Sequence, residues 1–595
     1  MDALARAVWE AKYRQPGENS LADSRRRVAR ALAAVEGRDC EAWTERFDAL
    51  LQDGRFLPGG RILAGAGTAR HVTLFNCFVM GLIEDSMDGI FQALKEGALT
   101  MQQGGGVGYD FSTLRPRGFR AHATGGIASG PVSFMAIWDA MCATLLSTGA
   151  RRGAMMATLR CDHPDIEDFI DAKREPGRLT HFNLSVQVTD AFMAAVRADR
   201  DWELVFPLAS LDPSERDGET LTRHWPGMGE VPCRVVRRVR ARELWDRIMR
   251  ATYDHAEPGV LFIDRINQLN NLHYREDISA TNPCGEVPLP PYGACDLGSI
   301  NLTRLVRDPF SERARFDFAA LAELVPVAVR LMDDVIDASR FPLPQQAEVE
   351  REDRRIGLGI TGLGDALIML GLHYGSEAAR KTAARIMRTI RDGAYRASIE
   401  LAREKGPFPA FEAAPYLAGE YARTLPEDIR AAIARHGIRN SHLNAIAPTG
   451  TISLLANNVS SGIEPVFDFR YRRRMLEQDG TAREYEVSDY AFRHFRAAHP
   501  EAPLPPPFVT ALELAPEQHL AMQAALQPFV DNSISKTINI PEDYPYPRFR
   551  EVYAEAYQLG LKGCTTYRPN PVTGAVLEPE GTQASHCCHI DREAD

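Results

Sequence analysis

The 595-residue sequence has no excess of positive charge and no apolar run long enough for a signal or membrane helix. Its formal net charge is -11 and its pI is about 5.8, so no overall basic field is available to hold the phosphates of a polynucleotide. We therefore expect no nucleic-acid partner, no membrane association and a cytoplasmic location. Ten cysteines without regular spacing argue against a secreted disulfide framework, so their interest is chemical.

Several cofactor motifs are also missing. No Gly-Lys dipeptide occurs, which excludes the standard ATP-binding P-loop. No histidine stands in the Asp-x-His-x-x-Gly pattern of mutase-type cobalamin sites. Residues 357–362 match the dinucleotide pattern Gly-x-Gly-x-x-Gly, but charged residues precede them where that pattern needs an apolar strand. The match is too weak to support a nicotinamide enzyme.

The chain divides into three parts. Apolar residues at helical spacing predict a small helical region over residues 1–55. In the second part, residues 56–568, short apolar runs such as 260–263, 356–360 and 443–446 alternate with longer helical stretches such as 321–335 and 379–405. This alternation is typical of an α/β fold with largely parallel strands. Prolines at 569 and 571 end regular structure, so residues 569–595 are predicted to form a flexible tail.

The most informative segment is Thr281 to Glu286, which reads Thr-Asn-Pro-Cys-Gly-Glu. Asn282, Cys284 and Glu286 stand two residues apart, so an extended backbone would point an amide, a thiol and a carboxylate to the same side. Pro283 and its neighbours oppose a helix and favour a rigid extended loop. Most lone cysteines are small buried hydrophobes, but burying an unpartnered amide and carboxylate beside one would cost roughly a few kcal/mol. The pattern therefore favours a reactive thiol.

At these residues the sequence resembles the catalytic subunit of ribonucleotide reductase. The resemblance extends from Phe56 to about Arg568 and follows the family's order through Leu74-Phe75-Asn76-Cys77, residues 294–302, residues 355–359 and residues 447–453. It implies a ten-stranded α/β barrel with Cys284 on a finger loop that threads its centre. The glycine stretch at 357–362 belongs to this family pattern, which accounts for the dinucleotide match.

The resemblance also implies a thiyl-radical mechanism. Cys284 would take the 3'-hydrogen of a ribonucleotide substrate, Glu286 would act as the base on the 3'-hydroxyl, and Asn282 would hold the substrate hydroxyls. Cys77 and Cys295 correspond to the pair that supplies two electrons and a proton as the 2'-hydroxyl leaves, and that ends as a disulfide. Such radicals need a site that excludes water.

Two nucleotide sites follow from the same resemblance. One turn would hold the substrate phosphates, although its residue types also serve as a plain helix cap; its residues are Pro448, Thr449, Gly450, Thr451, Ile452 and Ser453. Asp85 and Arg115 match residues that bind a deoxynucleotide effector, although by themselves they suggest a surface ion pair. Arg152 lies in the stretch 149–156, which resembles the loop that relays effector identity. The family places this site at a dimer interface, which implies a homodimer.

The residues at 560–568, Gly-Leu-Lys-Gly-Cys-Thr-Thr-Tyr-Arg, indicate the radical source. Relatives that import a radical from a second subunit carry two adjacent tyrosines here, whereas members that use adenosylcobalamin show this Lys-Gly-Cys-Thr pattern and the run 535–539. No glycyl-radical motif occurs in residues 581–595. The resemblance therefore implies adenosylcobalamin as cofactor, and the larger members of this group usually take diphosphates. The first 55 residues are too few for the ATP-binding domain of many relatives, so we expect no overall control by ATP.

The tail contains His586-Cys587-Cys588-His589. Family tails carry two spaced cysteines that pass electrons from a thioredoxin- or glutaredoxin-like reductant to the active-site disulfide. Adjacent cysteines lie only ~3.8 Å apart at Cα, so a bond between them would be strained. Cys587 and Cys588 are expected to act as this shuttle, with pairing to Cys564 or metal binding by the four residues as alternatives.

Two other functions remain open. One is a class I-type large subunit that needs a separate metal-radical subunit, and it predicts no turnover with adenosylcobalamin alone. The other is a catalytically inactive, nucleotide-binding regulator, which predicts deoxynucleotide binding without turnover. The complete set of Asn282, Cys284, Glu286, Cys77 and Cys295 argues against the second alternative.

Overall fold

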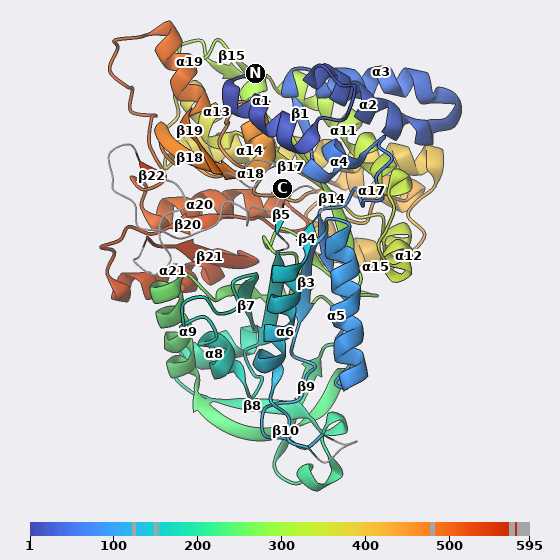
Figure 1. The fold of residues 1–595 in the computed structure, drawn as a ribbon, viewed down its shortest axis with the longest axis vertical. Helices are drawn as coiled ribbons and strands as arrows, with labels where there is room; N and C mark the ends of the chain where they lie inside the picture. Colours follow the sequence, from blue (N-terminus) through green and yellow to red (C-terminus); the bar gives the residue numbers. More distant parts are fainter. Residues whose placement is uncertain (122–125, 148–150, 153, 477–481, 570–577, 580–595) are drawn as a thin grey trace.

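The computed structural model describes residues 1–121, 126–147, 151–152, 154–476, 482–569 and 578–579. A ten-stranded sheet forms the centre of the molecule (Figure 1). Neighbouring strands follow the order β1-β14-β2-β3-β6-β7-β11-β21-β20, and β17 also pairs with β14. Their bounds are β1 Phe56–Pro58, β2 Cys77–Val79, β3 Gly106–Asp110, β6 Met155–Arg160, β7 Phe182–Val188, β11 Gly259–Phe262, β14 Ala294–Asn301, β17 Ile356–Thr361, β20 Thr537–Asn539 and β21 Gly563–Tyr567.

Parallel pairing dominates this sheet. Strands β2, β3, β6, β7 and β11 are parallel to one another, as are β14 with β17 and β20 with β21. Antiparallel pairs join these groups at β2 with β14 and at β11 with β21. The run 443–446 contributes isolated bridges, Leu358 to Asn444 and Ile446 to Ile534, in place of the strand predicted there. The predicted α/β class with largely parallel strands is confirmed.

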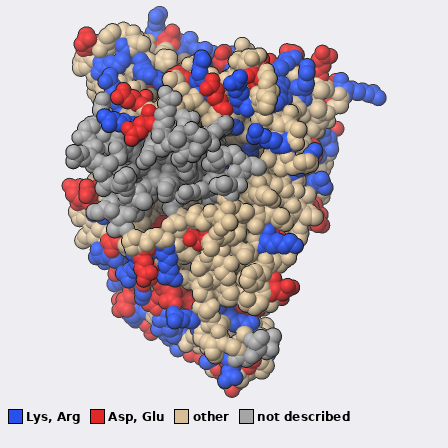
Figure 2. All heavy atoms as spheres, in the orientation of Figure 1, with Lys and Arg blue, Asp and Glu red and all other residues tan. Residues whose placement is uncertain are grey.

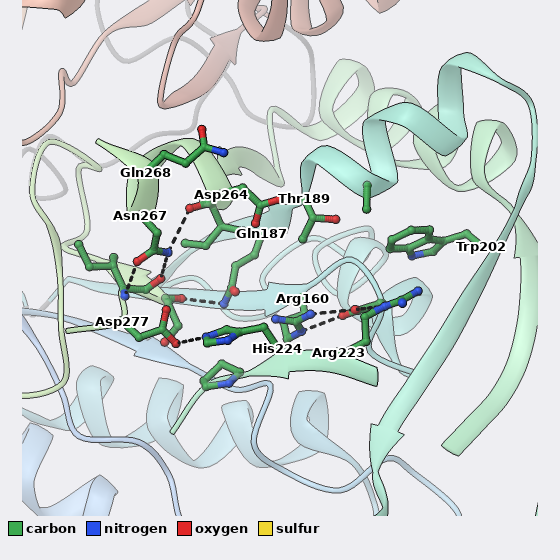
Figure 3. Close-up of a pocket in the computed structure, with 16 residues that line it drawn as sticks. Arg160, Gln187, Thr189, Trp202, Arg223, His224, Asp264, Asn267, Gln268 and Asp277 are labelled. Carbon is green, nitrogen blue, oxygen red and sulfur yellow. Dashed lines mark hydrogen bonds and ion pairs between the residues drawn. The ribbon is translucent and has the colours of Figure 1, made fainter. Parts of the chain in front are cut away.

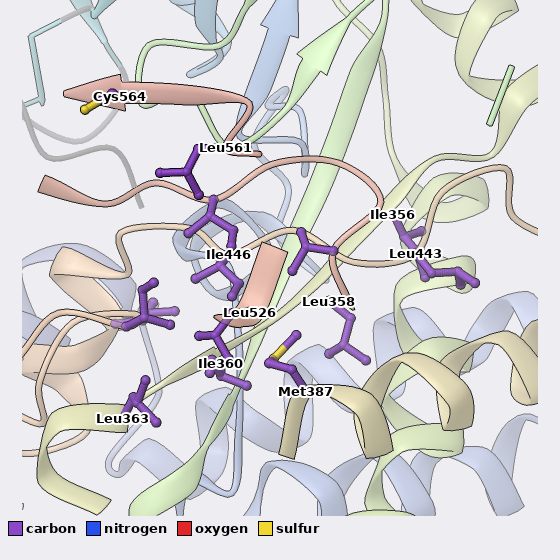
Figure 4. Packing of buried hydrophobic residues seen from close by; sticks show 14 of the residues in the cluster. Ile356, Leu358, Ile360, Leu363, Met387, Leu443, Ile446, Leu526, Leu561 and Cys564 are labelled. Carbon is purple, nitrogen blue, oxygen red and sulfur yellow. The ribbon is translucent and has the colours of Figure 1, made fainter. Parts of the chain in front are cut away.

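The first five residues of the glycine stretch at 357–362 lie within a buried strand, β17, and not in a phosphate-binding loop. All six residues of β17 are buried, and Figure 4 shows Ile356, Leu358 and Ile360 packed among apolar side chains that include Met387. A Cβ on Gly359 would meet the Ala445 carbonyl at 2.3 Å. Small residues are therefore needed because two backbone segments approach closely.

Helices surround the sheet. The N-terminal helices α1 (Ala3–Val8), α2 (Leu21–Ala33) and α3 (Cys40–Leu51) lie at one end of the molecule, and a three-stranded sheet lies at the other (Figure 1). A capping box of Ser20 and Asp23 begins α2. Helix α2 has one buried face and contacts α11 (Phe318–Ala338). The remaining long helices are α5 Met87–Gln102, α6 Pro131–Thr144, α9 Ala241–His255, α12 Pro344–Asp353, α14 Glu377–Lys405, α17 Glu427–His436, α20 Pro516–Leu526 and α21 Tyr546–Gln558. The small sheet contains β8 Asp201–Pro207, β9 Thr220–Trp225 and β10 Gly229–Arg240.

The surface mixes charges of both signs. Figure 2 shows Lys and Arg side chains interspersed with Asp and Glu over the drawn face. Within the described ranges, no helix combines the length and apolar character that crossing a membrane requires.

A short hairpin packs against the sheet and carries the residues that the sequence singles out. Its strands, β12 (Ala280–Thr281) and β13 (Pro288–Leu289), pair antiparallel, and β12 lies against β3. A Cβ on Gly108 of β3 would stand 1.9 Å from the Thr281 carbonyl oxygen. Only glycine therefore lets the hairpin approach β3 this closely.

Replacing this glycine tests the close approach. Gly108→Ala should lower the free energy of unfolding by about 1–3 kcal/mol, because the methyl group meets a backbone carbonyl that cannot move alone. Urea denaturation measures the change. Gly393→Ala in α14 is the matched control, because its Cβ meets only a Val325 methyl at 3.2 Å and alanine favours a helix. A Gly108→Ala protein as stable as the wild type would contradict the packing described.

Candidate active site

The tip of the hairpin is a tight β-turn over residues 282–285. The Gly285 amide donates to the Asn282 carbonyl at 3.1 Å, and Gly285 has φ of 81°. Proline suits the second position of such a turn and glycine the fourth. The extended loop predicted from the sequence is therefore wrong at its tip: Asn282, Cys284 and Glu286 are brought together by a turn and not by strand alternation.

The side chain of Asn282 holds this turn in place. Its Oδ1 accepts hydrogen bonds from the Val287 amide at 3.0 Å and from Thr281 Oγ1 at 3.2 Å. Its Nδ2 donates to Cys77 Sγ at 3.1 Å. Asn282 is fully buried, so the amide is satisfied by the hairpin on one side and by β2 on the other.

Glu286 is a buried carboxyl group that titrates near neutral pH. The Cys77 thiol donates toward Glu286 Oε1 at 3.7 Å, while Oε2 has no hydrogen-bond partner among the described residues. Burial raises the pKa of Glu286 to about 7, and hydrogen bonds from Asn282 and Cys77 oppose that rise. A carboxyl group with such a pKa can accept a proton at physiological pH.

Cys77 and Cys295 face each other on adjacent strands. They are register partners in the antiparallel pair of β2 and β14, both are free thiols, and both are buried among small apolar residues. Directly opposite residues of an antiparallel pair have Cα atoms roughly 4.5–5.5 Å apart, which is within the span of a disulfide. Burial raises the pKa of each thiol well above its usual value.

Cys284 lies on the open side of this group. It is only partly buried, and it lies close enough to contribute to the raised pKa of the Cys77 thiol. A Cβ on the next residue, Gly285, would meet no atom within 4 Å. The cluster therefore has a closed side at Cys77 and Cys295 and an open side at Cys284, with Asn282 and Glu286 between them.

Residues 448–453 cover the end of a turn and the first four residues of a short helix, α18 (Gly450–Leu455), with Thr449 at its N-cap. Thr449 has φ of 56°, a left-handed conformation that non-glycine residues rarely adopt. Hydrogen bonds hold it there: Thr449 Oγ1 pairs with Thr361 Oγ1 at 2.8 Å and accepts from the Gly462 amide at 2.8 Å. Ala447, just before the turn, belongs to the same buried cluster as Cys77 and Cys295.

Asp85 and Arg115 form an ion pair. Arg115 Nε donates to Asp85 Oδ2 at 2.8 Å, and their side chains are 12% and 19% exposed, so this pair is more buried than a typical surface pair. Arg152 lies in β5 (Arg151–Arg152). Its side chain lies outside the described residues, as do residues 148–150 and 153 of the predicted relay loop.

The predicted redox tail cannot be placed, because Cys587 and Cys588 lie outside the described residues. Cys564, the alternative partner, is buried on β21 within the main hydrophobic cluster (Figure 4). Burial raises the pKa of its thiol. Pairing with the tail would therefore require β21 to expose this side chain.

Strand β7 has a polar face that none of the sequence motifs predicts. Asn183, Ser185 and Gln187 alternate along this strand, and two of them hold the hairpin: Asn183 Nδ2 donates to the Pro283 carbonyl at 2.8 Å, and Gln187 Nε2 donates to the Ser279 carbonyl at 2.7 Å. A polar residue at every second position of an apolar run was the available signal.

A cavity of about 400 Å³ lies below the base of the hairpin (Figure 3). Several of its polar lining residues pair with one another: Arg160 with Asp162 at 2.8 Å and His224 with Asp277 at 2.7 Å. Cys284 does not line this cavity, so the cavity is separate from the cluster of thiols described above.

Family models and similar proteins all point to the same family. Residues 75–567 match the family model described as ribonucleotide reductase, barrel domain, and residues 1–71 match the one described as ribonucleotide reductase, all-alpha domain. The chain is 41% identical to a vitamin B12-dependent ribonucleoside-diphosphate reductase of Mycobacterium tuberculosis over 93% of this chain and 76% of that protein. It is 36% identical to a protein of the same name from Thermoplasma acidophilum over 91% of this chain and 67% of that protein. The ribonucleoside-diphosphate reductase large subunit of Vaccinia virus is 29% identical over 76% of this chain and 60% of that protein.

The facing thiols predict a specific disulfide. Mild oxidation with diamide should join Cys77 to Cys295, because these thiols are register partners, and peptide mass spectrometry identifies the bond. Cys161 and Cys233, which are also buried and free, serve as internal controls and should remain reduced. Recovery of both Cys77 and Cys295 as free thiols under conditions that oxidise other cysteines would contradict the geometry.

Proposed function

The chain belongs to the ribonucleotide reductase family, and on that premise we propose that it reduces ribonucleoside diphosphates to 2'-deoxyribonucleotides with adenosylcobalamin as cofactor. The observation that carries this proposal is the convergence of four buried groups on the turn of Cys284. An amide, a carboxyl group that titrates near pH 7 and a facing pair of thiols are the groups that this reaction needs.

Each group has a role in the proposed reaction. The Cys284 radical takes the 3'-hydrogen of the ribose, and Glu286 accepts the proton of the 3'-hydroxyl. The Cys77 thiol gives its proton to the departing 2'-hydroxyl, which leaves as water. Cys295 gives its hydrogen to C2', and the two sulfurs join as a disulfide. The electron released as the disulfide forms passes to the 3'-carbonyl, and Glu286 returns its proton to the 3'-oxygen. Cys284 then returns the hydrogen to C3', so the products are a deoxynucleotide, water and one disulfide. Asn282 orients the ribose hydroxyls and the Cys77 thiol.

Small residues of β7, β11 and β21 fit a bulky cofactor. Space is open beyond Gly285, and Thr565 on β21 is exposed. A Cβ on Gly259 would lie 3.2 Å from both Ser185 Oγ and Thr565 Oγ1, so a glycine and two small hydroxyl residues lie together, and Ser185 stands between Asn183 and Gln187, which both donate to the hairpin. Ser185, Gly259 and Thr565 would contact the cofactor, which supplies the radical that oxidises Cys284.

A separate radical-generating subunit is the less favoured alternative. Thr565 and Thr566 follow Cys564 on β21, in the stretch where the resemblance places a tyrosine pair in enzymes that import their radical. A threonine side chain cannot be oxidised as tyrosine can, so it cannot relay an electron to Cys284. A radical source bound next to Cys284 therefore suits these residues better. The inactive-regulator alternative is disfavoured because every group of the proposed reaction is present.

The nucleotide sites and the dimer remain part of the proposal. The amides and hydroxyls of residues 448–453 would hold the substrate phosphates. Asp85 and Arg115 would bind a deoxynucleotide effector together with Arg152. The neighbouring helix α5 exposes Met87 by 59% and Phe91 by 47%, an apolar surface that supports a homodimer at this site.

The domain division and the supply of electrons are also proposals. Helices α1 to α3 end at Leu51, just before β1 begins at Phe56, which supports a helical region at 1–55 followed by the catalytic region at 56–568. Residues 569–595 would carry electrons from a thioredoxin- or glutaredoxin-like protein through Cys587 and Cys588. Free thiols at the described cysteines suit a reducing compartment such as the cytoplasm.

Cofactor dependence is the direct test of the proposed activity. Purified protein with adenosylcobalamin, a dithiol reductant and a ribonucleoside diphosphate should form the deoxynucleotide, and no second subunit should be needed. Cys284→Ser should abolish turnover while leaving binding of deoxynucleotides unchanged. Turnover retained by Cys284→Ser, or no product from the wild type with cofactor, would reject the proposal; Cys40→Ser is the control for loss of a thiol outside the site.

The pKa of Glu286 predicts the acidic side of the pH profile. Glu286 must be ionised to accept a proton, and its pKa is raised to about 7, so kcat/KM should rise between pH 6 and pH 8 and be about tenfold lower at pH 6 than on the plateau. Glu286→Gln should remove most of the activity and this pH dependence. A wild-type profile that is flat from pH 6 to pH 8 would show that Glu286 is not the base.

A further inference from the structure

Strand β7 holds the hairpin of Cys284 at both ends. At the base, Gln187 Nε2 donates to the Ser279 carbonyl at 2.7 Å, and Thr158 Oγ1 of the neighbouring strand β6 donates to the same carbonyl at 2.9 Å. Near the tip, Asn183 Nδ2 donates to the Pro283 carbonyl at 2.8 Å. Asn183 and Gln187 are four residues apart in an extended strand, so they lie on one face of β7 and follow the hairpin along its length.

The carbonyl that Asn183 binds lies in the part of the turn that determines the turn type. Pro283 and Cys284 are the two central residues of the β-turn at 282–285, so the peptide between them is its central peptide. Rotation of the central peptide distinguishes the common turn types, and one of them requires a positive φ at the third residue. Cys284 is not among the residues with positive φ. Because this rotation changes φ of Cys284, it also changes the direction of the thiol.

We propose that Asn183 is a positioning residue for Cys284, which acts by fixing the central peptide of the turn through the Pro283 carbonyl. The inference rests on the proposed function, because it gives Asn183 a role only if Cys284 carries the radical. The Pro283 carbonyl can only accept, so the role needs a donor at position 183. An aspartate of the same shape would place a second acceptor against it.

This role differs from that of a substrate-binding residue. Asn183 is partly buried, and Pro283, whose carbonyl it binds, is buried. Asn183 therefore acts on the thiol and not on the strength of substrate binding. Its loss should lower kcat, because misplacement of a reacting atom by about 1 Å can cost ~100-fold in rate, and should leave KM nearly unchanged.

Two variants and two measurements test the inference. Asn183→Asp keeps the shape and removes the donor, and Asn183→Ala removes the amide. Both should lower kcat about 10- to 100-fold with KM within about twofold. In the protein without cofactor, the rate at which iodoacetamide alkylates Cys284, followed by peptide mass spectrometry, should rise about fivefold, as loss of one hydrogen bond suggests. Asn458→Asp, which loses a similar bond from Nδ2 to the Ser488 carbonyl at 3.1 Å, should leave this alkylation rate unchanged.

The measurements distinguish a positioning role of Asn183 from the other roles that it could have. Unchanged kcat and unchanged alkylation in folded variants would overturn the role of Asn183, and so would a raised KM at constant kcat, which would assign it to substrate binding. Loss of folding in both variants, judged by circular dichroism, would also overturn it, because the role would then be structural. Absence of deoxynucleotide from the wild type would reject the proposed function instead, and the alkylation rates would still report whether Asn183 controls Cys284.

Discussion

The side-chain amide of Asn282 is the interaction on which the site depends. It binds the hairpin through Oδ1 and the Cys77 thiol through Nδ2, so one planar group sets the distance between the turn of Cys284 and strand β2. Both ends of the amide are buried, where an unpaired donor or acceptor would cost about 1–3 kcal/mol. The position of Cys284 over the facing thiols is therefore coupled to the stability of the hairpin.

Burial explains the rest of the chemistry. The same dry surroundings that raise the pKa of Glu286 toward neutral pH keep Cys77 and Cys295 protonated. A protonated thiol can give its proton to a leaving hydroxyl, and an ionised Glu286 can take one from another hydroxyl. Two opposite proton transfers thus become compatible within one small site, because the fold buries the thiols and the carboxyl group together. Glycines at 108 and 359 allow the backbone segments around this site to approach closely.

The sequence predicts the class of fold and the residues that converge on the site. It does not predict the backbone geometry that brings these residues together. Alternating apolar runs predicted the parallel strands: the run 356–360 lies in β17, and the run 260–263 lies in β11 except for Ile263, which begins a helix. The run 443–446 forms only isolated bridges, because bridging partners far along the chain decide its pairing. The turn at the hairpin tip was misread as extended backbone, because the hydrogen bonds of Asn282 select a turn among the conformations that Pro283 allows. The facing of Cys77 and Cys295 depends on strand register, which local pattern does not contain.

The account places one ribose between the turn of Cys284 and the facing thiols, with its phosphates at residues 448–453. A crystal structure of the protein with a bound ribonucleoside diphosphate tests this arrangement most directly, through the distance from Cys284 Sγ to C3' of the ribose. We expect van der Waals contact between these two atoms, with Glu286 at the 3'-hydroxyl and Cys77 at the 2'-hydroxyl. A ribose bound outside the reach of Cys284, or one whose 2'-hydroxyl points away from Cys77, would contradict the account.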